Sequence, residues 1–437
     1  RALTSKYNAQ LSCGRVQTPT VAMIAALEEE IRDFKPVQYY GIEAFAGGFK
    51  FTWHDNKGGT RLFEKERCES ILRSVKSKNL VIAGVSRNKA STYAPPLYDL
   101  TELQRDANNM YGFSAKETLS IMQTLYERHK VLTYPRTDSR YLTEDIVDTL
   151  KDRVKACSVG PYAKIGFKIG SKPIRGNKNF VNNSRVSDHH AIIPTEKTVF
   201  LGDLSDRERK IYDLGIKRFL AVLSKPYEFE KIVISGKIGS EEFTSKGRIT
   251  LSMGWKEVYG NYEDEEELDD YPSEELNKLS NNSQLQVSSV KKTLGETNPP
   301  PRFTEATLLS AMENPVKFMK NADVELKKTI GETGGLGTVA TRADIIDKLF
   351  NSYLIEKKDK YIYTTSKGRQ LLDLVPSDLK SPVLTAKWEQ QLTDISRGKT
   401  DKNKFLNSMI DYTKSIVNGI KTSGKQYVHD NETKEKC

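Results

Sequence analysis

Cysteine is scarce in this chain of 437 residues, and the few cysteines lie far apart. They form no CxxC pair and occupy positions Cys13, Cys68, Cys157 and Cys437. This spacing does not support a disulfide framework. It predicts instead a protein of the reducing cytosol.

Long apolar runs are missing as well. No run approaches the ~20 residues that a transmembrane helix needs. The first ten residues, RALTSKYNAQ, lack the apolar stretch of a secretory signal peptide. Because the chain does not begin with methionine, we expect that both of its ends were cut from a longer protein. A GxxxxGK[ST] run is also absent, so no ATP site is predicted.

The composition is that of a folded, basic protein. Hydrophobic residues make up 37% and charged residues 29%, which supports a sizeable core under a solvated surface. The net charge of +10 favours a polyanionic partner, with nucleic acid ahead of a membrane surface.

Periodicity along the chain predicts mixed α and β structure. Residues 37–93 and 228–298 are rich in strand-like alternation, and the segment between them has helical spacing, as in Leu100, Leu103, Ala107 and Met110. We therefore expect one β domain that is interrupted by a helical domain. The predicted parts are 1–36 (first part of a helical base), 37–93 (first part of a β arch), 94–227 (inserted helical gate), 228–298 (second part of the arch) and 299–437 (second part of the base with a C-terminal tail).

The C-terminal part contains a winged-helix pattern. Thr304 is a predicted N-cap after a proline break, and residues 341–374 follow the order helix, short hairpin, helix. This outline is common in DNA-docking units, although a purely structural winged helix fits the pattern equally well.

Two polar stretches are expected to be exposed loops. Residues 155–187 are rich in glycine, lysine and asparagine. The acidic run Glu263–Asp270 is interpreted as a solvated loop rather than a metal site, because no strand end fixes its carboxylates.

Tyr134 carries the strongest chemical signal, within HKVLTYPRTDSRYL (129–142). A free phenol has a pKa near 10 and is a poor nucleophile at neutral pH, so its attack on a phosphodiester needs a nearby cation. Arg136 lies two residues away, on the same face of an extended segment. From spacing alone, a buried tyrosine beside a surface ion pair is the stronger alternative.

Four ordered runs change that balance. TYPRTDS (133–139), LSCGRVQTPT (11–20), SDHHAIIPT (187–195) and PPPRFTEATLL (299–309) with GLGTVATRADII (335–346) resemble the motifs of type IA DNA topoisomerases. The forms are closer to bacterial topoisomerase III than to bacterial topoisomerase I. Cys13 is a mild departure, in a position usually held by another small residue.

The resemblance implies a multidomain toroid with an interrupted β domain and winged-helix-like helical domains. It also implies transient cleavage of one strand through a 5′-phosphotyrosine at Tyr134, strand passage and religation without ATP. Arg136 would assist catalysis. The implied contacts to DNA come from Arg15, Gln17, Thr18, Asp138, Arg302, Thr338 and Arg342.

The double histidine needs a separate interpretation. Adjacent residues of an extended chain point to opposite sides and no third ligand is near, so metal binding by His189 and His190 is not expected. The resemblance favours His189 as the catalytic histidine, donating to a phosphate or assisting proton transfer. His190 is expected to pack or to position.

The resemblance further implies Mg²⁺, held by an N-terminal Toprim domain that precedes the region matching residue 1, so no metal ligand is expected in this chain. Cys437 could begin a C-terminal zinc module. The implied partners are single-stranded DNA and underwound or catenated duplex, with a helicase partner left open. A cytoplasmic, nucleoid-associated monomer is expected.

The main alternative is a single-stranded DNA-binding fragment with no catalysis of its own. Basic charge and a winged helix alone would support it. A tyrosine recombinase would need an HxxR element and a relaxase a histidine triad, and the sequence has neither.

Overall fold

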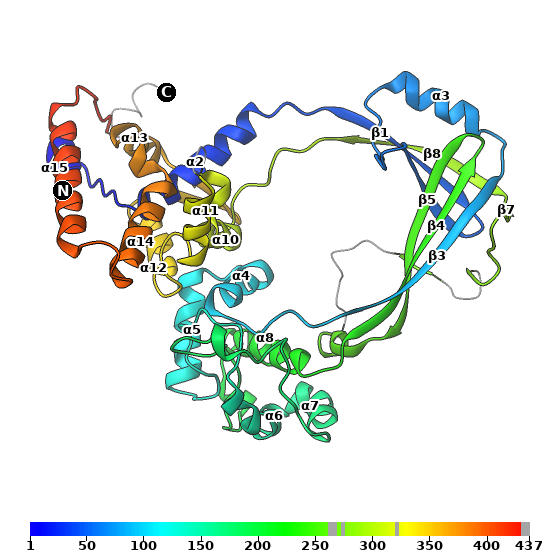
Figure 1. Cartoon of the computed structure of the whole chain (residues 1–437), viewed down its shortest axis with the longest axis horizontal. Coiled ribbons are helices and arrows are strands. Elements are labelled where there is room, and N and C mark those ends of the chain that lie inside the picture. The colour runs from blue at the N-terminus through cyan, green and yellow to red at the C-terminus, as the bar shows by residue number, and fades with distance from the viewer. Residues whose placement is uncertain (261–268, 272–275, 320–322, 430–437) are drawn as a thin grey trace.

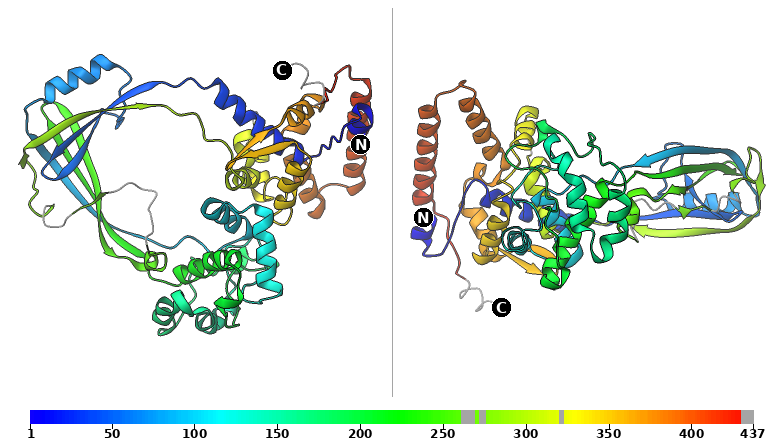
Figure 2. Two further views of the ribbon diagram at one scale, coloured as in Figure 1. Left: turned by 180° about the vertical axis from the view of Figure 1, so that it is seen from behind. Right: turned by 90° about the horizontal axis from the view of Figure 1, so that it is seen from below.

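The structure is a computed structural model that describes residues 1–260, 269–271, 276–319 and 323–429. The ribbon runs round a ring made of a helical base, a β arch and a helical insert (Figure 1). The view from below shows that the arch is thin, and both further views show that most of the helices gather at the other end (Figure 2). This arrangement confirms the predicted mixed α and β fold with an interrupted β domain.

The base combines both ends of the described chain. Its elements are α1 (Ala2–Tyr7), α2 (Gln17–Asp33), α10 (Glu305–Glu313), α11 (Val324–Glu332), α12 (Arg342–Asn351), β9 (Ile355–Lys358), β10 (Tyr361–Thr364), α13 (Ser366–Leu374), α14 (Pro382–Ser396) and α15 (Lys402–Thr422). One hydrophobic core joins most of them and includes Val21, Leu308 and Ile346, while α11 packs against α14 in a smaller cluster with Leu326, Ile330 and Ala386. The sequence α12, β9–β10 hairpin, α13 confirms the predicted winged-helix pattern, and Thr304 caps α10 by accepting from the Thr307 amide.

The arch is a mostly antiparallel sheet in the order β7-β3-β4-β5-β2-β1-β8, with β6 paired to β5. Its elements are β1 (Gln38–Ala46), β2 (Phe49–His54), α3 (Lys65–Val75), β3 (Leu80–Thr92), β4 (Tyr227–Ile238), β5 (Glu241–Ser252), β6 (Asp269–Asp270), β7 (Gln284–Leu285) and β8 (Val287–Glu296). Pairing of β3 with β4 and of β1 with β8 joins the two strand-rich stretches into one sheet.

Helix α3 corrects the expectation that residues 37–93 form strands throughout. Cys68, Ile71 and Val75 recur at helical spacing and are buried in the core of the arch. Most of the acidic run Glu263–Asp270 lies outside the described residues, and its last two residues form β6.

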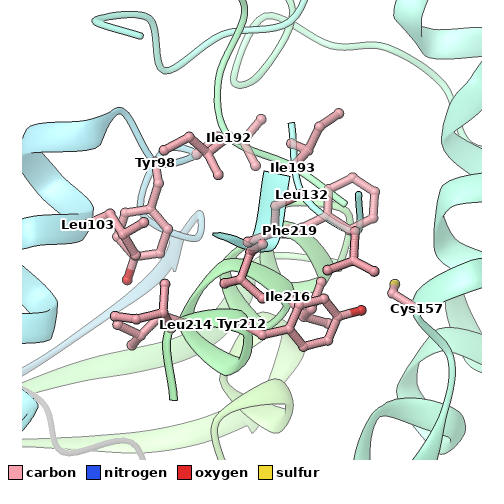
Figure 3. Close-up of a cluster of buried hydrophobic side chains, with 14 of the residues drawn as sticks. Tyr98, Leu103, Leu132, Cys157, Ile192, Ile193, Tyr212, Leu214, Ile216 and Phe219 are labelled. Atoms are coloured by element: carbon pink, nitrogen blue, oxygen red, sulfur yellow. The ribbon is translucent and has the colours of Figure 1, made fainter. Parts of the chain in front are cut away.

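The helical insert leaves the arch after β3 and returns to it at β4. Its helices are α4 (Leu100–Tyr111), α5 (Ala115–Glu127), α6 (Leu150–Cys157), α7 (Ala163–Gly170) and α8 (Asp206–Val222). They enclose a core in which Leu132 and Ile193 pack with Phe219 (Figure 3). Two expectations were wrong here: Met110 is 62% exposed and does not join the stripe, and the stretch 155–187 contains α7.

No helix among the described residues is long and apolar enough to cross a membrane.

Candidate active site

Two distant motifs meet at the segment that carries Tyr134. The Thr133 amide donates to the carbonyl of Ile193 at 3.0 Å, and the Ile193 amide donates to Thr133 Oγ1 at 3.0 Å. Further along, Thr137 Oγ1 donates to the carbonyl of His189 at 2.9 Å. The tyrosine segment therefore lies directly against the double-histidine segment.

The Tyr134 ring is half-buried between two other rings. The ring centroid of His189 lies 4.3 Å away at an interplanar angle of 40°, and Tyr126 of α5 packs edge-on at 5.4 Å. A cavity of about 340 Å³ opens beside Tyr134. It is lined by Thr133, Tyr134, Thr143, Asp145, Ile146, Val186, Ser187, Asp188, His189 and His190.

Burial alternates along the residues that follow. Pro135, Thr137 and Ser139 are buried, whereas Arg136 and Asp138 are exposed. This period of two is that of an extended segment, which turns one set of side chains inward and the other outward. Arg136 forms no ion pair with any residue that the structure describes, so its charge is available to an incoming anion.

The two histidines have different surroundings. His189 is exposed against the Tyr134 ring. His190 Nδ1 lies 2.7 Å from the carbonyl of Ala191; because a carbonyl only accepts, this nitrogen carries the hydrogen. Burial lowers the pKa of His190, so its ring is neutral near pH 7. Geometry thus separates an accessible histidine from a positioned one.

A second cavity, of about 490 Å³, contains part of the expected DNA-contacting set. It is lined by Arg15, Val16, Thr333, Gly335, Gly337, Thr338, Thr341, Asp344, Ile345, Lys348, Thr385 and Glu389. Arg15 Nη1 pairs there with Glu389 Oε1 at 2.6 Å. This cavity shares no lining residue with the one at Tyr134, so the structure places the expected residues at two separate sites.

The other expected contacts lie outside both cavities. Gln17 is half-buried, and its Oε1 accepts from Ser12 Oγ at 3.3 Å. The guanidinium carbon of Arg302 lies 4.6 Å from the ring centroid of Tyr363, which places it on the β9–β10 hairpin.

Thr18 and Arg342 do not support the DNA contacts expected of them in this conformation. Thr18 is fully buried, and its Oγ1 accepts from the Gly14 amide at 3.0 Å. Arg342 is 1% exposed and donates to the carbonyl of Gly334 and, at 3.1 Å, to Thr101 Oγ1. Both side chains satisfy internal polar groups, which leaves them out of reach of a strand.

Some residues near Tyr134 were missed by the sequence analysis. Tyr126, which packs against the Tyr134 ring, and Asp145, which lines the cavity, come from separate elements and carry no motif that would have singled them out. Asp188 lies inside the run SDHHAIIPT and could have been named from it. Among the described residues, no group of three or more His, Cys, Asp or Glu side chains is placed to hold a metal ion.

Comparisons with known proteins all match DNA topoisomerases. A family described as DNA topoisomerase matches residues 1–407. The chain is 55% identical over 439 residues to DNA topoisomerase 3 of Bacillus thuringiensis (strain Al Hakam), covering 100% of this chain and 60% of that protein. It is 53% identical over 438 residues to DNA topoisomerase 3 of Bacillus subtilis (strain 168), with the same coverage. The chain thus spans about 60% of the length of these curated relatives.

A solved structure supports the same fold. Full-length Topoisomerase I from Thermotoga maritima matches with a TM-score of 0.73 and 23% identity, over 95% of this chain and 65% of that chain. At this level of identity the likeness shows the fold alone.

Proposed function

The chain belongs to the DNA topoisomerase family, and from this membership we propose that it is the core of a type IA enzyme acting through Tyr134. The observation that carries the proposal is the meeting of Tyr134 and His189 at one cavity, with Arg136 unpaired beside them among the described residues. A nucleophile, a proton-carrying group and a cation are what phosphoryl transfer to a phenol requires.

The proposed step exchanges one phosphate ester for another. The Tyr134 oxygen bonds to phosphorus as the bond from phosphorus to the 3′ oxygen breaks. The phenol loses its proton and the 3′ oxygen gains one, which leaves a 5′-phosphotyrosine and a free 3′-hydroxyl. Reversal restores the strand without ATP, because the ester bond energy is conserved. Arg136 stabilises the charge that develops on the phosphate.

For a second strand to pass, the break in the cleaved strand must open while its 5′ end stays bonded to Tyr134. We propose that the helical insert, which carries Tyr134, moves away from the base as a unit. The separate hydrophobic cores of the insert, the arch and the base support this division into domains. Mg²⁺ would supply charge neutralisation at the phosphate when bound.

The proposed substrates follow from this scheme. They are single-stranded DNA, and underwound or catenated duplex that exposes single strands, acted on by a monomer. A second candidate, a DNA-binding fragment without catalysis, is favoured by the β9–β10 hairpin, on which Lys357, Lys358 and Lys360 gather next to Arg302.

A labelled single strand separates the two candidates. We expect the chain, fused behind the N-terminal acidic domain that the family resemblance implies and assayed with Mg²⁺, to form an adduct that survives denaturing electrophoresis. A 3′-end label should migrate with the protein and a 5′-end label should not, since the link is to the 5′ phosphate. Binding without any adduct would favour the DNA-binding fragment, and the opposite label would reverse the proposed polarity.

The histidines should respond unequally to removal. His189→Ala is expected to slow cleavage by about 10²-fold, at the lower end of the range for loss of a proton-transferring side chain. His190→Ala should cost less, because its ring is held by Ala191 and its pKa is lowered by burial. Single-turnover cleavage of a labelled strand measures both, and a larger loss in His190→Ala would exchange the two roles.

A further inference from the structure

The surface between the helical insert and the base is mainly polar. The Ala115 amide donates to Glu305 Oε2 at 3.0 Å, and the Ala306 amide donates to Asn108 Oδ1 at 3.1 Å. Lys116 pairs with Asp344 across the same surface. Among the described residues, Ala115 is the single residue of the insert that belongs to the hydrophobic core of the base. Little apolar area therefore opposes separation of these two parts.

A chain of alternating charges crosses this surface. It begins at Arg140, whose Nε lies 2.6 Å from Asp99 Oδ2 and whose Nη2 lies 3.3 Å from Glu102 Oε2. The same Glu102 oxygen also accepts from Arg105 of α4. On the far side, Arg105 Nη1 lies 2.9 Å from Glu313 Oε2 of α10. The chain thus runs from the insert into the base.

The near end of this chain is tied to the tyrosine segment. Arg140 continues the run that contains Tyr134 and Arg136. The Leu100 amide donates to the carbonyl of Thr137 at 3.1 Å, so the start of α4 is bonded directly to that run. Any change in how α4 holds Arg140 therefore alters the position of backbone close to the proposed nucleophile.

Two features make the balance at Glu102 sensitive to the base. Asp99 is 3% exposed, and burial raises its pKa while Arg140 opposes that effect. Arg105 divides its donors between Glu102 and the pair Glu313 and Ser310, whose Oγ lies 3.0 Å from Arg105 Nη1. When the base moves away, Arg105 loses Glu313 and Ser310, keeps its pairing with Glu102 and competes with Arg140 for that carboxylate.

We propose that Arg105 is a positioning residue that couples closure of the insert onto the base to the placement of the Tyr134 segment. With the two parts closed, Glu313 and Ser310 hold Arg105, and Asp99 and Glu102 hold Arg140. With the parts open, Arg105 loses Glu313 and Ser310, its existing pairing with Glu102 tightens, and the hold on Arg140 loosens. The reacting segment is then ordered in the closed state, where the strand ends meet. This role rests on the proposed function, but the coupling itself is independent of catalysis.

The coupling between closure and the Tyr134 segment can be measured by cross-linking the insert to the base. Lys116→Cys and Asp344→Cys, in a Cys13→Ser, Cys437→Ser background, place two thiols across it that a short thiol-reactive cross-linker can join. Hydrogen exchange then reports the backbone amides of Leu100, Ser139 and Tyr141, whose acceptors lie in the tyrosine segment. We expect the lock to slow their exchange roughly tenfold, within the usual range for coupling between sites.

Arg105→Met, which keeps the length of the side chain and removes its charge, should abolish this dependence on the lock. Arg105→Lys should restore part of the dependence on the cross-link. Arg128 is exposed at the C-terminal end of α5, so Arg128→Met should leave this dependence intact. The proposal would be overturned if the cross-link slowed exchange equally in Arg105→Met and in the protein that keeps Arg105, or if it slowed exchange in neither.

A catalytic measurement distinguishes this proposal from the proposed function. Where the parent forms the adduct, Arg105→Met should slow religation more than Glu313→Gln does, since only the first change removes the charge that Glu102 shares. Absence of the adduct in the parent would defeat the proposed function and leave the exchange result to decide the coupling.

Discussion

Tyr134→Phe is expected to abolish the covalent adduct with single-stranded DNA, while affinity for the strand stays within a few-fold. The substitution removes one hydroxyl, which is the proposed nucleophile, and keeps the ring that packs against His189 and Tyr126. Affinity is expected to persist because it rests on many phosphate contacts spread along the strand. Denaturing electrophoresis of a 3′-labelled strand measures the adduct, and fluorescence anisotropy measures binding.

Tyr126→Phe is the matched control. It removes a hydroxyl from the neighbouring ring, 5.4 Å from Tyr134 between centroids, and should leave the adduct in place. An adduct that persists in Tyr134→Phe and disappears in Tyr126→Phe would assign the nucleophile to Tyr126. Loss in both variants would indicate that packing of the rings, rather than one hydroxyl, controls cleavage.

Arg136→Ala should lower the cleavage rate by about 10²–10³-fold and change strand affinity far less. Loss of one preorganised donor to a developing negative charge costs roughly 2.7–4 kcal/mol in the transition state. Arg136 is exposed and has no ion pair with the described residues, so its removal leaves no buried partner uncompensated. Arg136→Lys should recover part of the rate, because a point charge replaces a planar fork incompletely. Single-turnover cleavage at saturating strand concentration measures the effect.

Arg128→Ala is the control for charge alone, since Arg128 is also exposed and lies on the same insert. It should change the cleavage rate little. If Arg136→Ala weakens binding and cleavage equally, Arg136 would be an anchor for the strand rather than a group that stabilises the reacting phosphate.

Arg342 illustrates the limit of motif-based interpretation. Its segment GLGTVATRADII resembles a DNA-contacting run, yet the guanidinium is buried and donates to Thr101 of the insert. Burial lowers the pKa of Arg342, and neighbouring Glu313 opposes that effect. A motif identifies a residue type at a position, whereas only packing decides whether the side chain faces a ligand or another part of the protein.

The sequence by itself determined the order of elements, the interruption of the arch and the chemistry expected at Tyr134. These features depend on local periodicity and on short runs such as TYPRTDS, in which the proposed nucleophile and Arg136 are neighbours along the chain. Helix α3 escaped detection because its buried apolar residues, Cys68, Ile71 and Val75, are few and set among charged ones.

The tertiary structure decided which side chains from segments distant in the sequence contact one another. It placed His189 against the Tyr134 ring, buried Thr18 and Arg342, and joined Arg140 to Glu313 through Glu102 and Arg105. None of these contacts has a local signal, because each depends on how separate elements pack and on which polar groups that packing leaves to be satisfied.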